Sequence, residues 1–318
     1  MVIGRGDTRI IKNNGGALVK MELCLGTVQF GMDYGIRGQK QPSIADAVQM
    51  LDYAMQNGIR SIDTANAYGT AEDVVGEFLQ KHTVGRERIF LISKFKPNLL
   101  DGVSEEKYYS IMKANLENSL ERLHTDYLDS YLLHSARYVW DDAIIDTLNR
   151  LKTEGYVRHV GVSVYETDEA KKCIERPNVD FMQLPYSIFD QRMEKEGVFD
   201  AAASIADTQI HSRSAFVQGL ILMEEFEVPP FLEKAKPIIR KVDEVCKEYE
   251  ISRIALAMSY VMRENAISHL VFGVDHIDQL KQNIALARNP LSPGLVDEIG
   301  KRFENIETEI VMPSLWKK

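Results

Sequence analysis

The chain has 318 residues, 45% of them hydrophobic and 27% charged, and its formal net charge is −9. The acidic balance argues against a general nucleic-acid binder, no apolar run approaches the roughly 20 residues of a membrane span, and segment 1–20 lacks the apolar block of a signal peptide. The three widely spaced cysteines, Cys24, Cys173 and Cys246, are typical of reduced thiols in a cytoplasmic protein without a metal framework.

Residues 8–24 hold the first predicted elements, a β-hairpin and the beginning of a strand. Two asparagines and two glycines at 13–16 are a strong turn signal between the two halves of the hairpin. A first core strand is expected over 23–27, and a loop punctuated by glycines follows it over 29–35.

Segments of strand and helix character then alternate to the end of the chain. The helix over 43–57 shows the signals clearly, with a capping-type start at Ser43, apolar residues at helical spacing and a stop at Gly58. The predicted strands are 23–27, 59–63, 89–94, 127–134, 157–164, 181–184, 209–215 and 269–273, and the predicted helices are 43–57, 71–81, 104–123, 141–153, 167–175, 194–206, 237–249, 252–264, 277–287 and 293–305.

Eight such strands in a chain of 318 residues predict an α/β fold, a (β/α)8 TIM barrel with extra C-terminal helices. We expect one domain over 1–318, with a C-terminal tail over 304–318. The strands are largely apolar without strict alternation, as parallel strands covered on both faces are. The alternative, an open doubly wound sheet, would carry a Gly-x-Gly-x-x-Gly turn after an early strand, and the sequence has none.

Four polar side chains follow or end successive predicted strands. Asp63 ends the second strand, Tyr68 lies in the loop beyond it, Lys94 ends the third strand and His134 the fourth. The carboxyl ends of barrel strands meet at the face where TIM barrels carry their chemistry, and neighbouring strands are about 4.8 Å apart. We therefore expect these side chains to converge in one pocket.

The four residue types form a proton-donating arrangement. An isolated tyrosine titrates near ~10, and an adjacent Lys94 ammonium would lower the pKa of Tyr68. Asp63 can keep Lys94 charged, while His134 can position a carbonyl oxygen that Tyr68 protonates. No side chain supplies hydride, so a nicotinamide or flavin is required. Singly, each residue has a structural explanation: a loop cap, a loop residue, a solvated lysine and a core histidine. Jointly they favour catalysis.

The chain resembles the aldo-keto reductase superfamily, in its bacterial-type form, over nearly its whole length. The motifs that carry the resemblance are Leu25-Gly26-Thr27, Ile62-Asp63-Thr64-Ala65 with Tyr68-Gly69, Ser93-Lys94, Leu132-Leu133-His134, Gly161-Val162-Ser163, Gln183 with Tyr186, and Gly219-Leu220. The resemblance implies NAD(P)H-dependent carbonyl reduction with Tyr68 as proton donor, and Asp63, Lys94 and His134 as its partners. It also implies that the N-terminal hairpin plugs the bottom of the barrel.

The same resemblance implies where the cofactor binds. Ser163 and Gln183 would hold the nicotinamide carboxamide, and the Arg213 guanidinium would stack on the ring where many relatives have an aromatic residue. The pyrophosphate would follow the loop after the seventh strand, and the adenosine would lie beside the start of helix 277–287. The cofactor-binding residues expected on this basis are Gly26, Thr27, Ser163, Gln183, Arg213, Ser214, Phe216, Gln218, Gly219, Leu220, Gly273, Asp275, Gln279 and Asn283.

Two departures from the family pattern bear on cofactor choice. Val164 replaces a frequent asparagine, so one amide contact to the nicotinamide is missing. Asp275 and Gln279 stand where NADPH-preferring members have Lys or Arg, and a carboxylate suits a ribose hydroxyl better than a phosphate. The hypothesis is a weakened NADPH preference, with dual use or NADH, unless Lys281 or Arg288 restores phosphate binding.

Residues near the mouth of the barrel are expected to contact the substrate. Met32, Tyr34 and Tyr165 are expected to contact it, with loop 95–102 and Trp140 or Trp316 at the mouth. Aromatic and polar groups together suit a sugar or other polyhydroxylated carbonyl compound. Two alternatives remain open: an NAD-dependent aldose or alcohol dehydrogenase working in the oxidative direction, and a cofactor-binding regulatory barrel with little turnover. The assembly could be a monomer or a small homo-oligomer.

Overall fold

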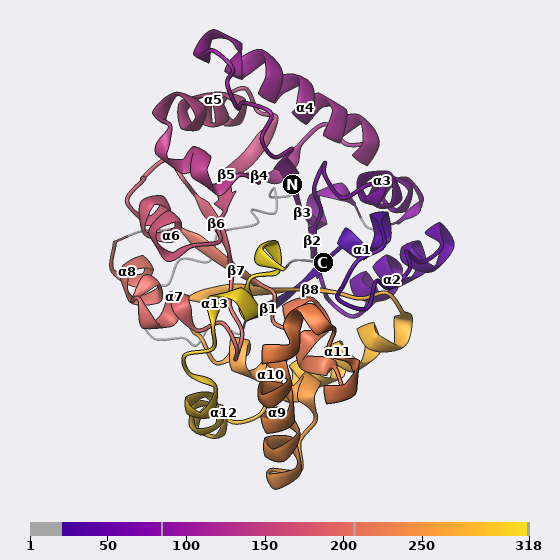
Figure 1. Cartoon of the computed structure of the whole chain (residues 1–318). Coiled ribbons are helices and arrows are strands. Elements are labelled where there is room, and N and C mark those ends of the chain that lie inside the picture. Colours follow the sequence, from indigo (N-terminus) through magenta and orange to yellow (C-terminus); the bar gives the residue numbers. More distant parts are fainter. Residues whose placement is uncertain (1–20, 84, 206–207, 317–318) are drawn as a thin grey trace, which may run out of the picture.

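Parallel strands close into a barrel at the centre of the molecule (Figure 1). The computed structural model describes residues 21–83, 85–205 and 208–316. Within them the barrel runs in chain order from β1 to β8, and β1 pairs with β8 to close it. The strands are β1 Glu22–Gly26, β2 Ser61–Asp63, β3 Phe90–Phe95, β4 Leu128–Leu133, β5 Val157–Ser163, β6 Phe181–Pro185, β7 Gln209–Arg213 and β8 Ile267–Gly273.

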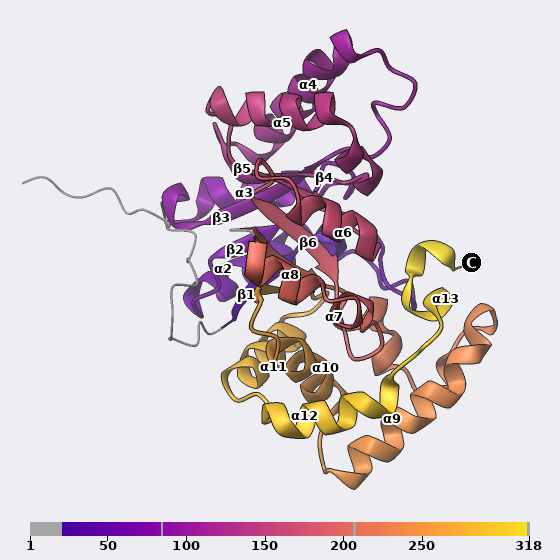
Figure 2. The same ribbon diagram turned by 90° about the vertical axis from the view of Figure 1, so that its left-hand side faces the viewer.

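Helices surround the barrel, as the two orthogonal views show (Figures 1 and 2). Their apolar faces pack on the strands, so most of the buried hydrophobic residues lie between the helices and the barrel. The helices are α1 Val28–Gly31, α2 Ile44–Gln56, α3 Ala71–Lys81, α4 Tyr108–Leu123, α5 Asp142–Thr153, α6 Thr167–Ile174, α7 Arg192–Lys195, α8 Val198–Ile205, α9 Lys236–Glu248, α10 Arg253–Met262, α11 Ile277–Arg288, α12 Pro293–Gly300 and α13 Thr308–Val311. In every helix of the described chain, length and apolarity fall short of what crossing a bilayer requires.

Local sequence explains where several helices begin. Ser43 Oγ accepts the backbone N–H of Asp46 at 3.1 Å and caps α2, as its place in the sequence predicts. Asp141 caps α5 through the N–H of Ile144, also at 3.1 Å. These side chains satisfy donors that the first turn of a helix leaves without partners.

The predicted fold class and the order of the elements are confirmed, and the differences are local. The predicted helix 194–206 is two helices, α7 and α8, because Gly197 between them adopts a left-handed φ of 69°. The predicted helix 293–305 stops as α12 at Gly300 and continues as a short 3-10 turn. Residues 8–20 of the predicted hairpin lie outside the described residues, and 22–24 belong to β1.

A histidine occupies the interior of the barrel on β7. His211 is fully buried and stacks on His269 of β8 with 4.0 Å between ring centroids. Neither ring nitrogen of His211 has a hydrogen-bond partner among the described residues. Burial, helped by the nearby His269 and Lys94, holds the pKa of His211 well below its ordinary value. The protonated form is therefore disfavoured in the folded protein.

This burial predicts acid sensitivity. Because the folded-state pKa of His211 is depressed, its contribution to stability is complete above the unfolded pKa near ~6.5 and falls as pH drops below it, by about 1.4 kcal/mol per pH unit. We expect His211→Phe to remove that part of the slope when the free energy of unfolding in urea is compared at several pH values. The exposed His124, replaced by Asn, should leave the slope unchanged, and a slope unaltered in His211→Phe would contradict the assignment.

Candidate active site

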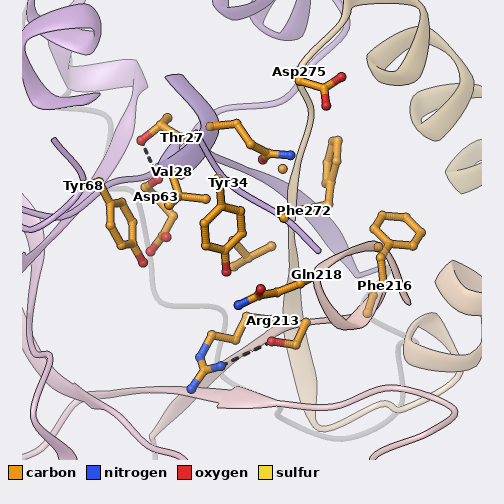
Figure 3. Close-up of a pocket in the computed structure, with 18 of the residues that line it drawn as sticks. Thr27, Val28, Tyr34, Asp63, Tyr68, Arg213, Phe216, Gln218, Phe272 and Asp275 are labelled. Atoms are coloured by element: carbon orange, nitrogen blue, oxygen red, sulfur yellow. Dashed lines mark hydrogen bonds between the residues drawn. The ribbon is translucent and has the colours of Figure 1, made fainter. Parts of the chain in front are cut away.

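The strand ends bring the predicted catalytic side chains together. Asp63 is the last residue of β2 and Lys94 is the fifth residue of β3, while His134 directly follows β4. The pairing of β2 with β3 and of β3 with β4 sets the spacing between these side chains. Tyr68 approaches the same place from the loop between β2 and α3, and Figure 3 shows its phenol beside Asp63.

Lys94 is the centre of the arrangement. Its Nζ lies 2.8 Å from both carboxylate oxygens of Asp63 and 2.9 Å from the carbonyl oxygen of Thr64. It also donates to the phenol oxygen of Tyr68 at 3.4 Å. Lys94 is 0% exposed and Asp63 is 4% exposed. Burial works to lower the pKa of Lys94, but Asp63 and Tyr68 outweigh it and hold that pKa above its usual value.

Two effects act on the pKa of Tyr68 in opposite directions. Burial raises the pKa of Tyr68 above its ordinary value, while the Lys94 ammonium acts to lower it. The effect of Lys94 has the direction expected from the sequence, but it is smaller than the effect of burial. Tyr68 therefore remains a protonated phenol at neutral pH, as a proton donor must.

His134 stands edge-on to Tyr68, with 5.7 Å between ring centroids and an interplanar angle of 85°. Burial, with the charges of Lys94 and Arg213, lowers the pKa of His134 to about 3. The imidazole is thus neutral at physiological pH and carries one N–H. Its Nδ1 is buried and has no hydrogen-bond partner among the described residues.

A cavity of about 490 Å³ opens over these side chains. It extends from Tyr68 and His134, along the loop after β7, to Asp275 beyond β8 (Figure 3). Most of the residues predicted to contact cofactor or substrate line it: Gly26, Thr27, Tyr34, Ser163, Tyr165, Gln183, Arg213, Ser214, Phe216, Gln218, Gly219, Gly273, Asp275, Gln279 and Asn283. Asp63 lines it too, and Lys94 lies behind Asp63.

Two loops from opposite sides of the cavity are joined to each other. The N–H of Ile36, in the loop after α1, donates to the carbonyl oxygen of Gln218 at 3.0 Å. Arg37 donates to the carbonyl oxygen of Leu222 at 3.2 Å and forms an ion pair with Glu227. We call residues 34–37 and 217–227 the roof of the cavity. Val217, Gln218 and Gly219 all have positive φ, and the N–H groups of Val217 and Gly219 donate to the carbonyl oxygens of Ser214 and Phe216 at 2.9 Å.

Arg213 forms part of the cavity wall below Gln218 (Figure 3). Its guanidinium carbon lies 4.3 Å from the centre of the Tyr165 ring, and Nη2 donates to the carbonyl oxygen of Val164 at 2.9 Å. One face of the guanidinium is therefore covered by Tyr165, and only the opposite face is left for the expected nicotinamide contact.

The far end of the cavity is acidic. Gln279 Nε2 donates to Asp275 Oδ1 at 2.6 Å, and the N–H of Asp275 donates back to Gln279 Oε1 at 3.0 Å. The two cations considered as replacements for a phosphate-binding residue are engaged elsewhere. Lys281 contacts Asp278 at 3.3 Å, and Arg288 donates to Asn57 at 3.0 Å.

Several predicted residues lie outside the lining of the cavity, including Trp140 and all of loop 95–102. Met32 is 40% exposed and Trp140 47% exposed, and Leu220 is fully buried. Trp316 packs near Phe231 while its indole N–H donates to Ile310. Residues that sequence reasoning did not select also line it, namely Val28, Gln29, Gly35, Gln39, Ala215, Leu222, Ile254, Val271 and Phe272. Val28, Gln29 and Phe272 lie close in sequence to the predicted glycines of β1 and β8, and this closeness could have indicated that they line the cavity. Ile254 comes from α10, and no feature of the sequence indicated that it lines the cavity.

Comparisons with known proteins show a family and a fold. A model of the aldo/keto reductase family matches residues 22–302. The chain is 27% identical over 259 residues to the uncharacterized oxidoreductase YqkF of Bacillus subtilis, covering 76% of this chain and 82% of that protein. It is 24% identical over 270 residues to an NADH-specific methylglyoxal reductase of Escherichia coli, covering 74% and 80%. The holo form of aldo-keto reductase AKR11C1 from Bacillus halodurans superimposes with a TM-score of 0.71 at 23% identity, covering 91% of this chain and 95% of that one.

Proposed function

Because the chain belongs to the aldo/keto reductase family and is an NAD(P)H-dependent enzyme, we propose that it reduces a small aldehyde or ketone to the alcohol with Tyr68 as the proton donor. The observation that carries the proposal is Lys94, whose Nζ contacts both the Asp63 carboxylate at 2.8 Å and the Tyr68 phenol at 3.4 Å. A buried ammonium in contact with a phenol stabilises the phenolate that remains when the proton leaves.

Each residue of the site has one task in this mechanism. Tyr68 holds the proton that passes to the carbonyl oxygen, and Lys94 stabilises the resulting phenolate. Asp63 keeps Lys94 charged, and the Gln183 amide, which donates to Asp63 Oδ1 at 2.8 Å, holds that carboxylate in place. Neutral His134 can donate its N–H to the same carbonyl oxygen.

The residues present fit a dinucleotide. Ser163 and Gln183 line the cavity with a hydroxyl and an amide, Ser214 and Gln218 of the loop after β7 add further polar side chains, and Asn283 lines the far end. When bound, a reduced nicotinamide supplies the hydride that no side chain can provide. A cavity of about 490 Å³ lies within the range of small-molecule and cofactor sites.

A panel of carbonyl compounds tests the proposal directly. We expect oxidation of NADH or NADPH with small aldehydes, including methylglyoxal, which the name of the Escherichia coli relative suggests. Sugar aldehydes belong in the panel because the hydroxyls of Tyr34 and Tyr165 lie in the cavity. Cofactor binding without turnover of any compound would instead favour a regulatory barrel, and faster initial rates with alcohols and NAD would favour the oxidative direction.

We further propose a preference for NADH. At the far end of the cavity Asp275 presents a carboxylate, which repels a 2′-phosphate but accepts hydrogen bonds from a ribose hydroxyl. Lys281 and Arg288, the cations that could offset it, are bonded to Asp278 and Asn57. Among the described residues that line the cavity, Arg213 is the only lysine or arginine, and it lies at the end near Tyr165.

Asp275→Asn should reduce the preference for NADH over NADPH. The substitution removes the charge while the amide oxygen can still accept from Gln279, so we expect NADPH to bind about tenfold more tightly, which corresponds to about 1.4 kcal/mol. NADH affinity should change less than about threefold, as measured by fluorescence titration. Asp146→Asn, at an exposed carboxylate on α5 outside the cavity lining, is the control and should leave the ratio unchanged. Wild-type protein that binds NADPH at least about tenfold more tightly than NADH would contradict the proposal.

A further inference from the structure

A buried carboxylate lies directly behind the loop that carries Tyr68. Glu72, in the first turn of α3, is 0% exposed. One of its oxygens accepts from the Ser93 hydroxyl at 2.6 Å, and Ser93 is the neighbour of Lys94 on β3. Burial raises the pKa of Glu72, while Ser93 and the Arg122 guanidinium act against that rise. The charged form of the Glu72 carboxylate therefore depends on Ser93 and Arg122.

Arg122 of α4 supplies the charge that Glu72 needs and also reaches the Tyr68 loop. Its Nη1 lies 3.0 Å from Glu72 Oε2, and Nη2 donates to the carbonyl oxygen of Gly69 at 2.5 Å. The same guanidinium contacts Asp73 at 2.8 and 3.0 Å. Arg122, on α4, thus connects Gly69, the residue after Tyr68, to α3. A planar guanidinium has enough N–H donors for all of these contacts, and a lysine ammonium does not.

The other end of the loop is fixed to the same place. The side-chain amide of Asn66 donates to Asn118 at 3.1 Å and to Ser119 at 3.2 Å, both on α4, and lies 3.4 Å from Glu72. Tyr68 is therefore bracketed by two anchored residues, Asn66 and Gly69. We call Glu72, Arg122 and Asn66 the donor-loop clamp.

The phenol oxygen of Tyr68 makes one polar contact among the described residues, with Lys94 at 3.4 Å, which is long for a hydrogen bond. The ring also stands edge-on to His134, and the Lys94 ammonium lies 4.8 Å from the ring centre. A small outward movement of the loop would lengthen all of these contacts. The distance between the phenol and the Lys94 ammonium therefore depends on the backbone of the loop.

We propose that Arg122 is a positioning residue for the reduction, acting through the donor-loop clamp to keep the Tyr68 phenol within reach of Lys94. The inference rests on the proposed role of Tyr68. It assigns to a residue on the outer helix layer a specific effect on proton transfer, separate from its contribution to stability.

The test compares Arg122→Gln and Arg122→Lys with a matched ion pair at the other end of the barrel. Arg86 and Asp129 form an equally buried pair, with 19% and 3% of their side chains exposed against 18% and 0% for Arg122 and Glu72. Asp129 lies near the start of β4, away from the strand ends that carry Lys94 and His134. Arg86→Gln therefore reproduces the loss of a buried arginine without touching the Tyr68 loop.

We expect Arg122→Gln to lower kcat about 10- to 100-fold, the effect of a displacement of about 1 Å at a reacting group. KM and the NADH dissociation constant should stay within about twofold, and the deuterium isotope effect with 4-deuterated NADH should increase because the chemical step becomes slower. Arg122→Lys should give an intermediate kcat. Arg86→Gln should lower the urea midpoint by less, because Asp129 keeps the Arg158 guanidinium at 2.9 Å, and it should leave kcat unchanged.

Asn118→Ala gives a version of the test that does not threaten folding, because Asn118 is exposed. It should lower kcat in the same direction by a smaller factor. An unchanged kcat in both Arg122→Lys and Asn118→Ala, or an equal loss in Arg86→Gln, would overturn the inference. If Tyr68→Phe keeps full turnover, the proposed donor itself is wrong. If Tyr68→Phe is inactive while the Arg122 variants resemble wild type, only the positioning role fails.

Discussion

Tyr68→Phe should lower kcat by about 10³- to 10⁴-fold, near the upper range for the loss of a general acid. The substitution removes only the hydroxyl, and the ring can keep its edge-on contact with His134. Because the role proposed for the hydroxyl is proton transfer, we expect the NADH dissociation constant to stay within about threefold. Steady-state rates with the best substrate of the panel, together with a fluorescence titration of NADH, measure both quantities.

Tyr131 provides the matched control for this substitution. It is a fully buried tyrosine on β4 whose hydroxyl donates to Asn115 at 3.0 Å and lies outside the cavity lining. Tyr131→Phe should cost about 1 kcal/mol of stability for the lost hydrogen bond and leave kcat unchanged. A Tyr68→Phe variant that retains more than about a tenth of wild-type kcat would exclude Tyr68 as the principal donor.

Lys94→Met should reduce both stability and turnover. The substitution leaves the Asp63 carboxylate buried without its ammonium, and breaking a buried ion pair in this way costs about 3–5 kcal/mol. The phenolate of Tyr68 also loses its stabilising charge, so kcat should fall by about 10²- to 10³-fold. Urea unfolding and steady-state kinetics on the same preparation give the two effects.

The double substitution Asp63→Asn with Lys94→Met separates the two effects. Removing both charges leaves no ion buried alone, so the double variant should recover a large part of the lost stability. It should remain as inactive as Lys94→Met because the donor still lacks its ammonium. A double variant less stable than Lys94→Met would mean that packing around the lysine, and not its charge, dominates.

The positions of the strand ends could be predicted from the sequence because they depend on local pattern and on one rule of topology. Asp63, Lys94 and His134 each stand at or just beyond the end of an apolar segment, and parallel strands necessarily bring those ends to the same rim. The helix starts at Ser43 and Ser252 follow from local capping in the same way.

Contacts between distant parts of the chain could not be predicted in this way. The bond from Ile36 to Gln218 joins loops 182 residues apart (218 less 36), and the contact of Arg122 with Gly69 uses a helix face that periodicity marks only as polar. The net shift in the pKa of Tyr68 could not be predicted either, because the sequence shows the charged neighbour but gives no measure of burial. Such features depend on tertiary packing.

The Lys94–Asp63 pair and the roof of the cavity differ in their exposure to water. Lys94 and Asp63 are almost completely enclosed, so mobile counter-ions cannot enter between them and dissolved salt should leave their attraction nearly intact. Arg37 and Glu227 of the roof are 36% and 31% exposed, where ions do penetrate. Raising the ionic strength should therefore weaken the Arg37–Glu227 ion pair of the roof while the attraction between Lys94 and Asp63 stays nearly unchanged.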